Sequence, residues 1–296
     1  MNITDYLSTR RKLVEQALDE FLPGADEYPN KIHKAMRHSI FAGGKRLRPI
    51  LVIASCEIVG GTIKQAIPTA CAVECIHTYS LIHDDLPCMD DDDLRRGIPA
   101  CHKVFGEGIA VLAGDALLTF AFQLLANNCK LSEVSEHNAL KVIAEISKAC
   151  GTYGLIGGQV MDLESENQTT DLNTLKYIHQ HKTGALITTS IRSGAILASA
   201  STQELDILTE FGNLLGLAFQ ITDDILDVEG ALEKLGKTPG KDKQKNKATF
   251  PALYGLHESK IMAEKCINEA IGLVRPLGEK GQILINIANY ILKRNM

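Results

Sequence analysis

The sequence predicts an all-α protein in which many helices pack as one large bundle. Apolar residues recur at three- and four-residue steps through most of the chain, which is the spacing of one helix face. Strand signals are weak, because tryptophan is absent and no alternating runs are bounded by Asn-Gly or Asp-Gly turns. The breaks between periodic segments are short, so we expect roughly ten or more helices in a single bundle.

Six segments carry the strongest helical pattern. They are Ile50–Val59, Ile67–His83, Val111–Leu125, Leu140–Cys150, Leu186–Ala198 and Glu204–Val228. The last segment is apolar on so much of its circumference that other helices must surround it. Breaks fall at Pro23–Pro29, Gly43–Gly44, Gly60–Gly61, Pro87–Pro99, Asn127–Lys130, Glu164–Asp171 and Leu235–Pro251. None resembles a linker between domains, so residues 1–296 are expected to form one domain.

Composition narrows the possible functions. The net charge of −5 leaves no basic excess to neutralise nucleic-acid phosphates. Residues 1–20 contain four acidic side chains and no apolar core, unlike a signal peptide. The most apolar segment, Gly108–Ala126, is close to the lower length limit for a membrane span and has Asp115 near its middle. We therefore expect a buried or interface helix there, and no membrane span.

The eight cysteines do not predict a zinc site. Cys71 and Cys75 have the four-residue spacing of helix neighbours, but no second pair or Cys/His cluster completes a ligand set. Free thiols in a reducing cytosol are the better interpretation, and they place the protein in the cytoplasm.

An acidic cluster lies on the last strongly apolar helix. Asp223, Asp224 and Asp227 stand close together, and the four-residue step from Asp223 to Asp227 keeps those two on one face with Gln220. Adjacent carboxylates on an apolar helix repel one another and cannot be buried unpaired. A divalent cation such as Mg²⁺, which prefers carboxylate and phosphate oxygens, would supply the missing charge.

A first acidic cluster contains Asp84, Asp85 and the run from Asp90 to Asp93. His77, Ser80 and Asp84 share one helix face, whereas Asp90 comes six residues after Asp84 and would not align on an unbroken helix. Pro87 disfavours the helical conformation at Leu86, so the chain could turn there and bring Asp90 back toward the same ion. A solvated acidic loop is the alternative for this run alone.

Together these segments resemble the trans-isoprenyl diphosphate synthases, and specifically bacterial-type farnesyl diphosphate synthases. The matching segments are Gly43-Gly44-Lys45-Arg46-Leu47-Arg48-Pro49, His77 to Asp85, the acidic run through Gly97, Gly157-Gly158-Gln159, Lys182-Thr183-Gly184 and Phe219 to Asp227. They follow the family's order across nearly the whole chain. The resemblance implies an isoprenoid-synthase helical bundle with a central cavity, a Mg²⁺-dependent prenyl transferase and a homodimer, with the Val111–Leu125 helix as candidate interface.

The resemblance also assigns roles to individual residues. Metal ligands would be Asp84, Asp85, Asp90, Asp223, Asp224 and Asp227, holding about three Mg²⁺ ions (Mn²⁺ could replace them) against an allylic diphosphate. That diphosphate would also contact Arg95, Lys182, Lys237 and Lys247. Isopentenyl diphosphate would bind without metal at Gly44, Lys45, Arg48, His77 and Arg96, where several cationic donors are needed. Pro49 is expected to begin a helix whose N-terminal dipole also favours anions.

The expected chemistry is ionisation, condensation and deprotonation. Lys182 would stabilise the departing diphosphate, while Thr183 and Gln220 would face the allylic cation without attacking it. Tyr79 lies five residues before Asp84, about 7.5 Å along a helix axis. By resemblance, Tyr79 and the neighbouring Ser80 set product length, and a bulky residue here favours a C15 product.

Three alternatives stay open at this stage. A geranylgeranyl diphosphate synthase shares much of the motif but tends to carry a smaller residue at the position of Tyr79. A terpene cyclase also uses an aspartate-rich metal site, although it needs no second diphosphate pocket such as Lys45, Arg48 and Arg96 would form. A non-catalytic subunit of a heteromeric synthase would be expected to lose acids from one cluster, and here both clusters are intact.

Overall fold

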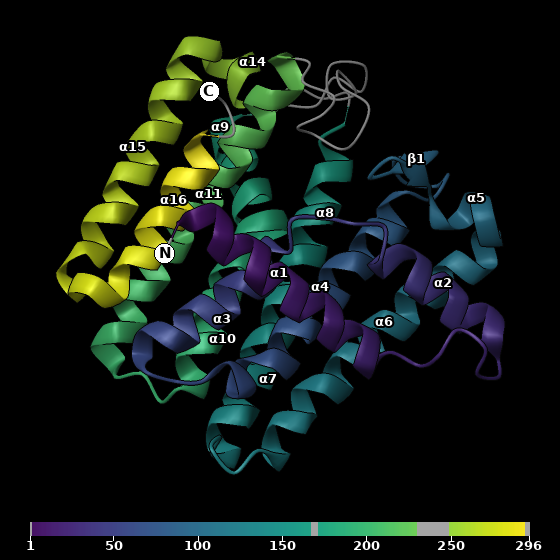
Figure 1. Cartoon of the computed structure of the whole chain (residues 1–296). Coiled ribbons are helices and arrows are strands. Elements are labelled where there is room, and N and C mark those ends of the chain that lie inside the picture. The colour runs from purple at the N-terminus through teal and green to yellow at the C-terminus, as the bar shows by residue number, and fades with distance from the viewer. Residues whose placement is uncertain (1, 167–170, 230–248, 294–296) are drawn as a thin grey trace.

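The computed structural model describes residues 2–166, 171–229 and 249–293, and most of them are helical (Figure 1). The helices are α1 (Ile3–Phe21), α2 (Asn30–Ile40), α3 (Leu47–Val59), α4 (Ile63–Asp84), α5 (Cys101–Phe105), α6 (Glu107–Asn127), α7 (Glu136–Cys150), α8 (Leu155–Glu164), α9 (Leu172–Ile178), α10 (Ala185–Leu197), α11 (Thr202–Glu229), α14 (Phe250–Tyr254), α15 (Leu256–Val274) and α16 (Gln282–Lys293). Short helical turns add η1 (Asn128–Lys130), η2 (His179–Gly184) and η3 (Arg275–Gly281). The expected all-α bundle is confirmed.

Four helices form the interior of the bundle. Helix α3 packs against α4 and α10, and α10 packs against α11, while α6 covers α4 and α15 covers α11. Every residue from Pro49 to Cys56 is buried, as is every residue from Leu186 to Leu197 except Arg192. Segments this apolar on all sides can lie only where protein surrounds them. Their packing makes one large apolar core that reaches from α1 to α16.

Two departures from regular α-helix lie beside the acidic segments. Leu94–Arg95 (β1) and Ile98–Pro99 (β2) pair antiparallel as a small hairpin after the first acidic run. The turn η2 is a π-helix, with a wider repeat than the α-helices on either side of it. Single π-helical turns inside helices are frequent at functional sites.

Helix boundaries differ from the sequence prediction in one place that bears on the site. Pro49 does not begin its helix, because α3 starts at Leu47 and Arg46 caps it with left-handed backbone angles. Proline is compatible with the whole first helical turn, where its missing N–H has no intrahelical partner, so its presence could not fix the first residue. Arg48 consequently lies inside the first turn of α3.

Helix α6 is the apolar helix that the sequence singled out. Among the described residues, Glu107–Lys130 is the one helical stretch with the length and composition to cross a membrane, which is weak evidence because core helices share those properties. Val111 and Leu112 on this helix are exposed, while its opposite face packs on α4. Helix α6 is therefore not fully buried within the chain.

Candidate functional site

The first acidic motif folds back on itself. Helix α4 ends at Asp84, and the amide N–H of Asp90 donates to the carbonyl oxygen of Asp84 at 2.8 Å. Further amides return to the end of α4, from Asp92 to the carbonyl of Asp85 at 3.2 Å and from Asp91 to that of Leu86 at 3.1 Å. The helix is thus interrupted where Pro87 predicts, and the turn brings Asp90 back beside Asp84.

Burial makes the two aspartates at the end of α4 costly to ionise. It raises the pKa of Asp84, which Lys182 partly offsets and Asp90 reinforces. Burial likewise raises the pKa of Asp85, although the Arg95 guanidinium counteracts it. Arg95 Nε donates to the two carboxylate oxygens of Asp85 at 2.9 and 3.2 Å, and its Nη2 contacts Asp92 at 3.2 Å. Cationic side chains therefore supply the counter-charge here.

On α11, the aspartates of the second motif have different surroundings. Asp223 is half-buried, whereas Asp224 is only 3% exposed and has both oxygens engaged. Oδ1 accepts a hydrogen bond from Gln220 Nε2 at 3.0 Å, and Oδ2 accepts from the Phe250 amide at 3.0 Å and lies 3.3 Å from His179 Nε2. Asp227 is also buried. Asp224 therefore connects α11 to α14 and to η2.

The π-helical turn η2 lies between the two acidic motifs. Thr183 Oγ1 donates to Gln220 Oε1 at 2.9 Å, one turn of helix before Asp223. The preceding residue, Lys182, is close enough to Asp84 to lower its pKa, and its Nζ donates to Asp162 of α8 at 2.7 Å. One short turn thus presents a cation toward the first motif and a hydroxyl toward the second.

Close approach of α8 to η2 depends on a glycine. A methyl group at Gly158 would lie 2.2 Å from the amide nitrogen and 2.7 Å from the Cα of Lys182, which no side chain can tolerate without a shift of backbone. This glycine belongs to the Gly157-Gly158-Gln159 segment, and Asp162 follows it by one helical turn. The segment therefore holds Lys182 and its carboxylate partner together.

Three of the five residues predicted to bind isopentenyl diphosphate form a basic cluster. Burial and the cationic Arg48 and Arg96 hold the pKa of His77 well below its usual range, so the imidazole is neutral. Burial lowers the pKa of Arg48, which is opposed by the carboxylates of Glu74 and Asp223. Arg48 on α3 is thus within electrostatic reach of the second acidic motif on α11.

Gly44 and Arg96 meet at the edge of this cluster. The Arg96 guanidinium hydrogen-bonds to the carbonyl of Gly43, and a methyl group at Gly44 would lie 2.5 Å from its Cζ. Gly44 itself has a φ of +127°, which side chains rarely adopt. Gly43 and Gly44 thus allow the Arg96 guanidinium to pack directly against their backbone.

Lys45 directly precedes Arg46, the residue that caps α3. It is exposed and lines a cavity of about 250 Å³ with Arg11 and Tyr290, and the lining does not include Arg48, His77 or Arg96. The other two predicted lysines, Lys237 and Lys247, lie outside the described residues. Their predicted contact with the allylic diphosphate stays a prediction.

Tyr79 is buried on α4, five residues before Asp84. Its ring packs edge-on against His83 with centroids 5.7 Å apart, and Cys150 at the end of α7 lies near enough to raise the pKa of its phenol, after the larger effect of burial. Its hydroxyl has no hydrogen-bond partner in the described ranges of the chain. Ser80 is also buried, and its hydroxyl donates to the carbonyl of His77 within the same helix at 2.9 Å. Tyr79 therefore fills apolar space between α4 and α7.

The donor set near Asp84 and Asp90 fits a hard divalent cation. The donors are carboxylate oxygens, and the backbone turn holds two such side chains at the same place. Burial raises the pKa of Asp84 and Asp85, and Lys182 and Arg95 offset this only in part. A bound dication would favour the ionised carboxylates more strongly. Asp224 fits less well as a ligand, since both of its oxygens already accept hydrogen bonds.

Sequence reasoning missed several charged partners in the site. Glu74 is only 1% exposed, accepts a hydrogen bond from Arg46 at 2.6 Å and lies 3.9 Å from Arg96. A signal was available, because Glu74 precedes His77 by three residues on an otherwise apolar helix. Asp162 and His179 were missed too, and only the fold brings them to Lys182 and Asp224.

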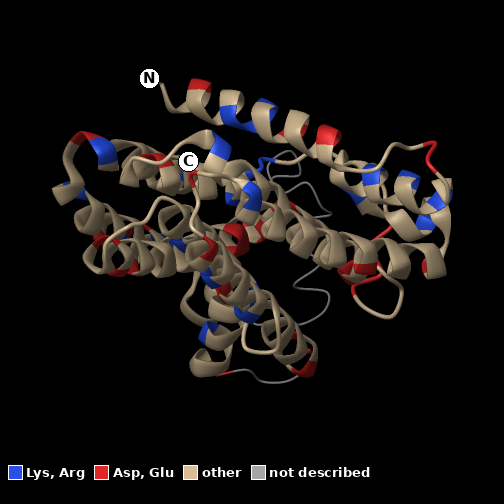
Figure 2. Ribbon diagram, turned by 90° about the horizontal axis from the view of Figure 1, so that it is seen from below, with Lys and Arg blue, Asp and Glu red and all other residues tan. Residues whose placement is uncertain are grey.

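Among the described residues, charged side chains are not separated by sign into different parts of the bundle. Figure 2 shows the Lys and Arg positions intermixed with the Asp and Glu positions along the helices. This agrees with the small net charge of −5. The basic residues of the site therefore act as a local cluster within an acidic chain.

Comparison with known proteins identifies close relatives. The family model described as polyprenyl synthetase matches residues 29–284. A dimethylallyltranstransferase of Fischerella ambigua is 52% identical over 294 residues, covering 99% of this chain and 84% of the relative. A geranylgeranyl diphosphate synthase of Cyanophora paradoxa is 47% identical, with 99% and 97% covered. The farnesyl diphosphate synthase of Bacillus subtilis is 45% identical, with 99% and 98% covered.

A solved structure shares the whole fold. The crystal structure described as an FPP/GFPP synthase from Zymomonas mobilis superposes with a TM-score of 0.88 at 36% sequence identity, covering 98% of each chain. The all-α architecture, the acidic motifs and the basic cluster are therefore found in a chain whose relatives carry the names of short-chain prenyl synthases.

Proposed function

Because the chain belongs to the polyprenyl synthetase family and is a prenyltransferase, we propose that it makes (2E,6E)-farnesyl diphosphate. In this proposal it condenses isopentenyl diphosphate first with dimethylallyl diphosphate and then with geranyl diphosphate. All 296 residues would form a single polyprenyl synthase domain. We also propose a cytoplasmic homodimer in which the exposed apolar face of α6 is the interface.

One observation carries the proposal. The turn η2 joins both acidic motifs, because Lys182 acts on Asp84 while Thr183 bonds to Gln220, one turn before Asp223. A diphosphate held between the motifs would therefore meet a cation and a polar, non-nucleophilic surface at the same point. Prenyl transfer needs this combination, since the leaving group is anionic and the remaining allyl group becomes cationic.

Binding of the allylic diphosphate falls to the acidic residues and their basic neighbours. Asp84, Asp85, Asp90, Asp223 and Asp227 would hold Mg²⁺ against the phosphate oxygens, which neutralises charge that develops on the leaving group. Asp224 would instead position Gln220.

Two cationic side chains complete that binding. Lys182 and Arg95 would exchange their present partners, Asp162 and Asp85, for phosphate oxygens.

The remaining steps need little from the protein beyond shielding. Thr183 Oγ1 and Gln220 Oε1 would face the allylic cation with partial negative charge. Isopentenyl diphosphate, held by Arg48, Arg96 and the neutral His77, would attack through its double bond. The released diphosphate would then take the proton, so no protein general base is required.

Product length follows from the position of Tyr79. Its ring stands one and a half turns from Asp84 and fills the space toward α7, where a growing tail would extend. In this proposal a C15 tail would reach the Tyr79 ring, which would block further elongation. Relatives carry both farnesyl and geranylgeranyl names, so geranylgeranyl diphosphate is the alternative product.

Product analysis tests the proposal. The purified chain is incubated with Mg²⁺, dimethylallyl diphosphate and isopentenyl diphosphate, and the prenyl alcohols are identified after phosphatase treatment. Farnesol as the main alcohol is expected, while geranylgeraniol would reassign the product. A hydrocarbon formed from farnesyl diphosphate alone would indicate a cyclase instead. Activity that needs a second, different subunit would contradict the proposal that the chain works alone.

A further inference from the structure

His102 is a buried histidine without a hydrogen-bond partner among the residues that the structure describes. Its side chain is only 6% exposed, and neither Nδ1 nor Nε2 contacts a donor or acceptor in the described part of the chain. Buried polar atoms in folded proteins are almost always hydrogen-bonded, because an unpaired one is destabilising. The proposed prenyl transfer gives His102 no role, so it does not explain why the two nitrogens of this buried ring are unpaired.

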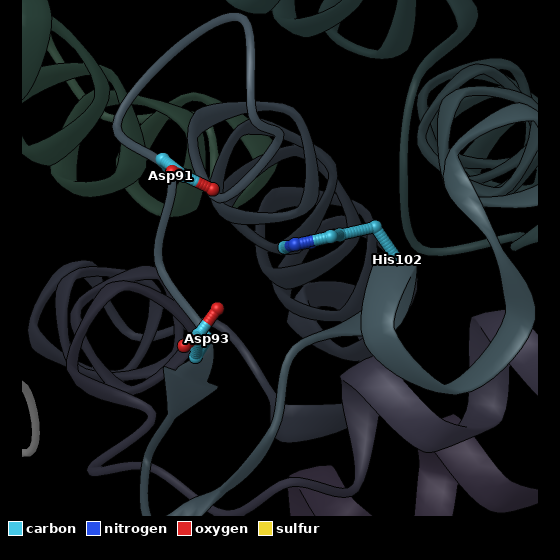
Figure 3. Close-up of side chains that lie close together, drawn as sticks. All are labelled: Asp91, Asp93 and His102. Atoms are coloured by element: carbon cyan, nitrogen blue, oxygen red, sulfur yellow. The ribbon is translucent and has the colours of Figure 1, made fainter.

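The imidazole points between two carboxylates. Figure 3 shows the His102 ring directed into the gap between Asp91 and Asp93, which come from the loop facing the start of α5. One ligand atom from each of the three side chains lies within 4.8 Å of the other two. Ligands about 2.1 Å from a common tetrahedral ion stand roughly 3.4 Å apart. Small rotations of the two exposed carboxylates would close the difference.

The backbone holds these residues in place independently of any ion. The amide of Ala100 donates to the carbonyl of Asp93 at 2.9 Å, which fixes the loop against the first residues of α5. Asp91 has a φ of +51°, a left-handed conformation that turns the chain between the two acidic positions. The hairpin of β1 and β2 then leads back to His102. The three donors are thus partly preorganised.

A lysine now provides the local positive charge. Lys103 Nζ lies 2.6 Å from Asp93 Oδ1, and both side chains are largely exposed. Exposed ion pairs of this kind contribute little to stability, so a bound dication could replace the ammonium group. Lys103 does not satisfy His102, because neither imidazole nitrogen has a hydrogen-bond partner among the described residues.

We propose that Asp91, Asp93 and His102 form a separate binding site for a divalent transition metal of the zinc type. An imidazole nitrogen with two carboxylate oxygens suits Zn²⁺, Co²⁺ or Fe²⁺, whereas Mg²⁺ prefers oxygen ligands alone. The site would remain open on its exposed side, where water completes the coordination. It differs in donor chemistry from the all-carboxylate groups at Asp84 and Asp223.

The location gives such an ion a structural consequence. Asp90 and Arg95 belong to the proposed allylic site. Asp91 directly follows Asp90, and Asp93 stands two residues before Arg95. An ion that ties both acids to α5 would hold this loop rigid. Metal binding would therefore restrict the motion of the loop that carries Asp90 and Arg95, although the ion itself would not contact the substrate.

Cobalt binding in excess Mg²⁺ tests the site. Millimolar Mg²⁺ occupies the oxygen-rich sites, and Co²⁺ is then titrated into the full-length chain while its visible absorption is recorded and bound metal is counted by equilibrium dialysis. We expect one tight Co²⁺ per chain with the weak visible bands of nitrogen and oxygen ligands. His102→Gln and Asp91→Asn should each weaken this binding about tenfold or more, since even residues behind a ligand often contribute that much.

Matched variants keep the outcome interpretable. His137→Gln and Asp26→Asn replace exposed residues of the same types and should leave Co²⁺ binding unchanged. Asp91 and Asp93 are exposed, so Asp91→Asn and Asp93→Asn test the site even if loss of the buried His102 disturbs folding. The proposal is overturned if these variants bind Co²⁺ as the wild type does. It is equally overturned if binding depends on the exposed thiols of Cys88 or Cys129, tested as serine variants.

Discussion

At the residue scale, Gln220 is held between two partners that fix the orientation of its amide. Its Oε1 accepts from Thr183 and its Nε2 donates to Asp224. An ionised carboxylate can only accept hydrogen bonds, so Asp224 requires the amide nitrogen on its side. The amide oxygen, with its partial negative charge, is thereby kept beside Thr183, where the proposed mechanism needs it.

Removing the Asp224 carboxylate should destabilise the protein. Asp224→Ala leaves the Gln220 amide and the Phe250 N–H without their acceptor in a buried place, so we expect the free energy of unfolding to fall by about 1–3 kcal/mol. Urea denaturation measures this change. Asp206→Ala, at an exposed position on the same helix, should stay within about 0.5 kcal/mol of wild type. An equal loss in both variants would contradict the assignment.

His77 should make stability depend on pH. Its folded pKa is depressed by burial and by Arg48 and Arg96, so below about pH 6.5 the unfolded chain binds a proton that the folded chain does not. The free energy of unfolding therefore falls as pH drops through 6.5, by up to about 1.4 kcal/mol per pH unit for this group. The stabilising contribution is fully present above that pH.

The His77→Gln variant isolates this effect. We expect its unfolding free energy to fall less than that of wild type between pH 7.5 and 5.5, while the exposed His137→Gln control keeps the wild-type slope. Urea denaturation at three pH values within this range gives the comparison. Parallel pH curves for wild type and His77→Gln would show that His77 is not the group responsible.

At the element scale, α8 and η2 touch at Gly158 with no space for a side chain. Gly158→Ala should push the two elements apart, weaken the contact between Lys182 and Asp162, and lower both stability and turnover. A loss of about 1–3 kcal/mol in unfolding free energy is expected from overpacking of this kind. Urea denaturation and steady-state kinetics are the measurements.

A second glycine serves as its control. Gly272 lies in α15, where an added methyl group meets nothing within 4 Å. Gly272→Ala should therefore be neutral or stabilising by about 0.4–1 kcal/mol. If Gly158→Ala behaved in the same way, the close packing of α8 on η2 could not be what positions Lys182.

The distance along α4 between Tyr79 and Asp84 should set product length. Tyr79→Ala removes the ring that fills the space toward α7, so a tail can extend and C20 product should appear beside or in place of C15. Chromatography of the dephosphorylated products measures the shift. Tyr153→Ala, which changes a tyrosine that is 78% exposed, should leave the product unchanged. A C15-only distribution from Tyr79→Ala would refute the floor assignment.

At the scale of the whole molecule, periodicity predicted the bundle because its interior helices are apolar on nearly all sides. The segments around Ile53, Ile191 and Leu215 could lie only inside protein, and the structure buries all three. The interruption after Asp84 was also predictable, since Pro87 acts locally on the backbone. Features that depend only on residues close together in the chain can be predicted from the sequence.

Ion-pair partners that are far apart in the chain cannot be predicted in this way. Asp162 reaches Lys182 only because α8 packs on η2, and Glu74 reaches Arg46 across 28 residues of chain. The cavity that Lys45 lines with Arg11 and Tyr290 depends in the same way on how α1 and α16 are placed. Spacing along a helix cannot reveal a contact that tertiary packing creates. For this reason the acidic motifs were easier to predict than the ion pairs around them.

Pyrophosphate binding tests most directly whether both acidic motifs act on one diphosphate. Inorganic pyrophosphate is titrated calorimetrically into the full chain with and without Mg²⁺, for wild type, Asp84→Asn, Asp223→Asn and the exposed Asp206→Asn control. We expect binding that requires Mg²⁺, that is lost in both motif variants and that is retained in the control. Binding of equal strength without Mg²⁺, or binding retained in either motif variant, would contradict the account.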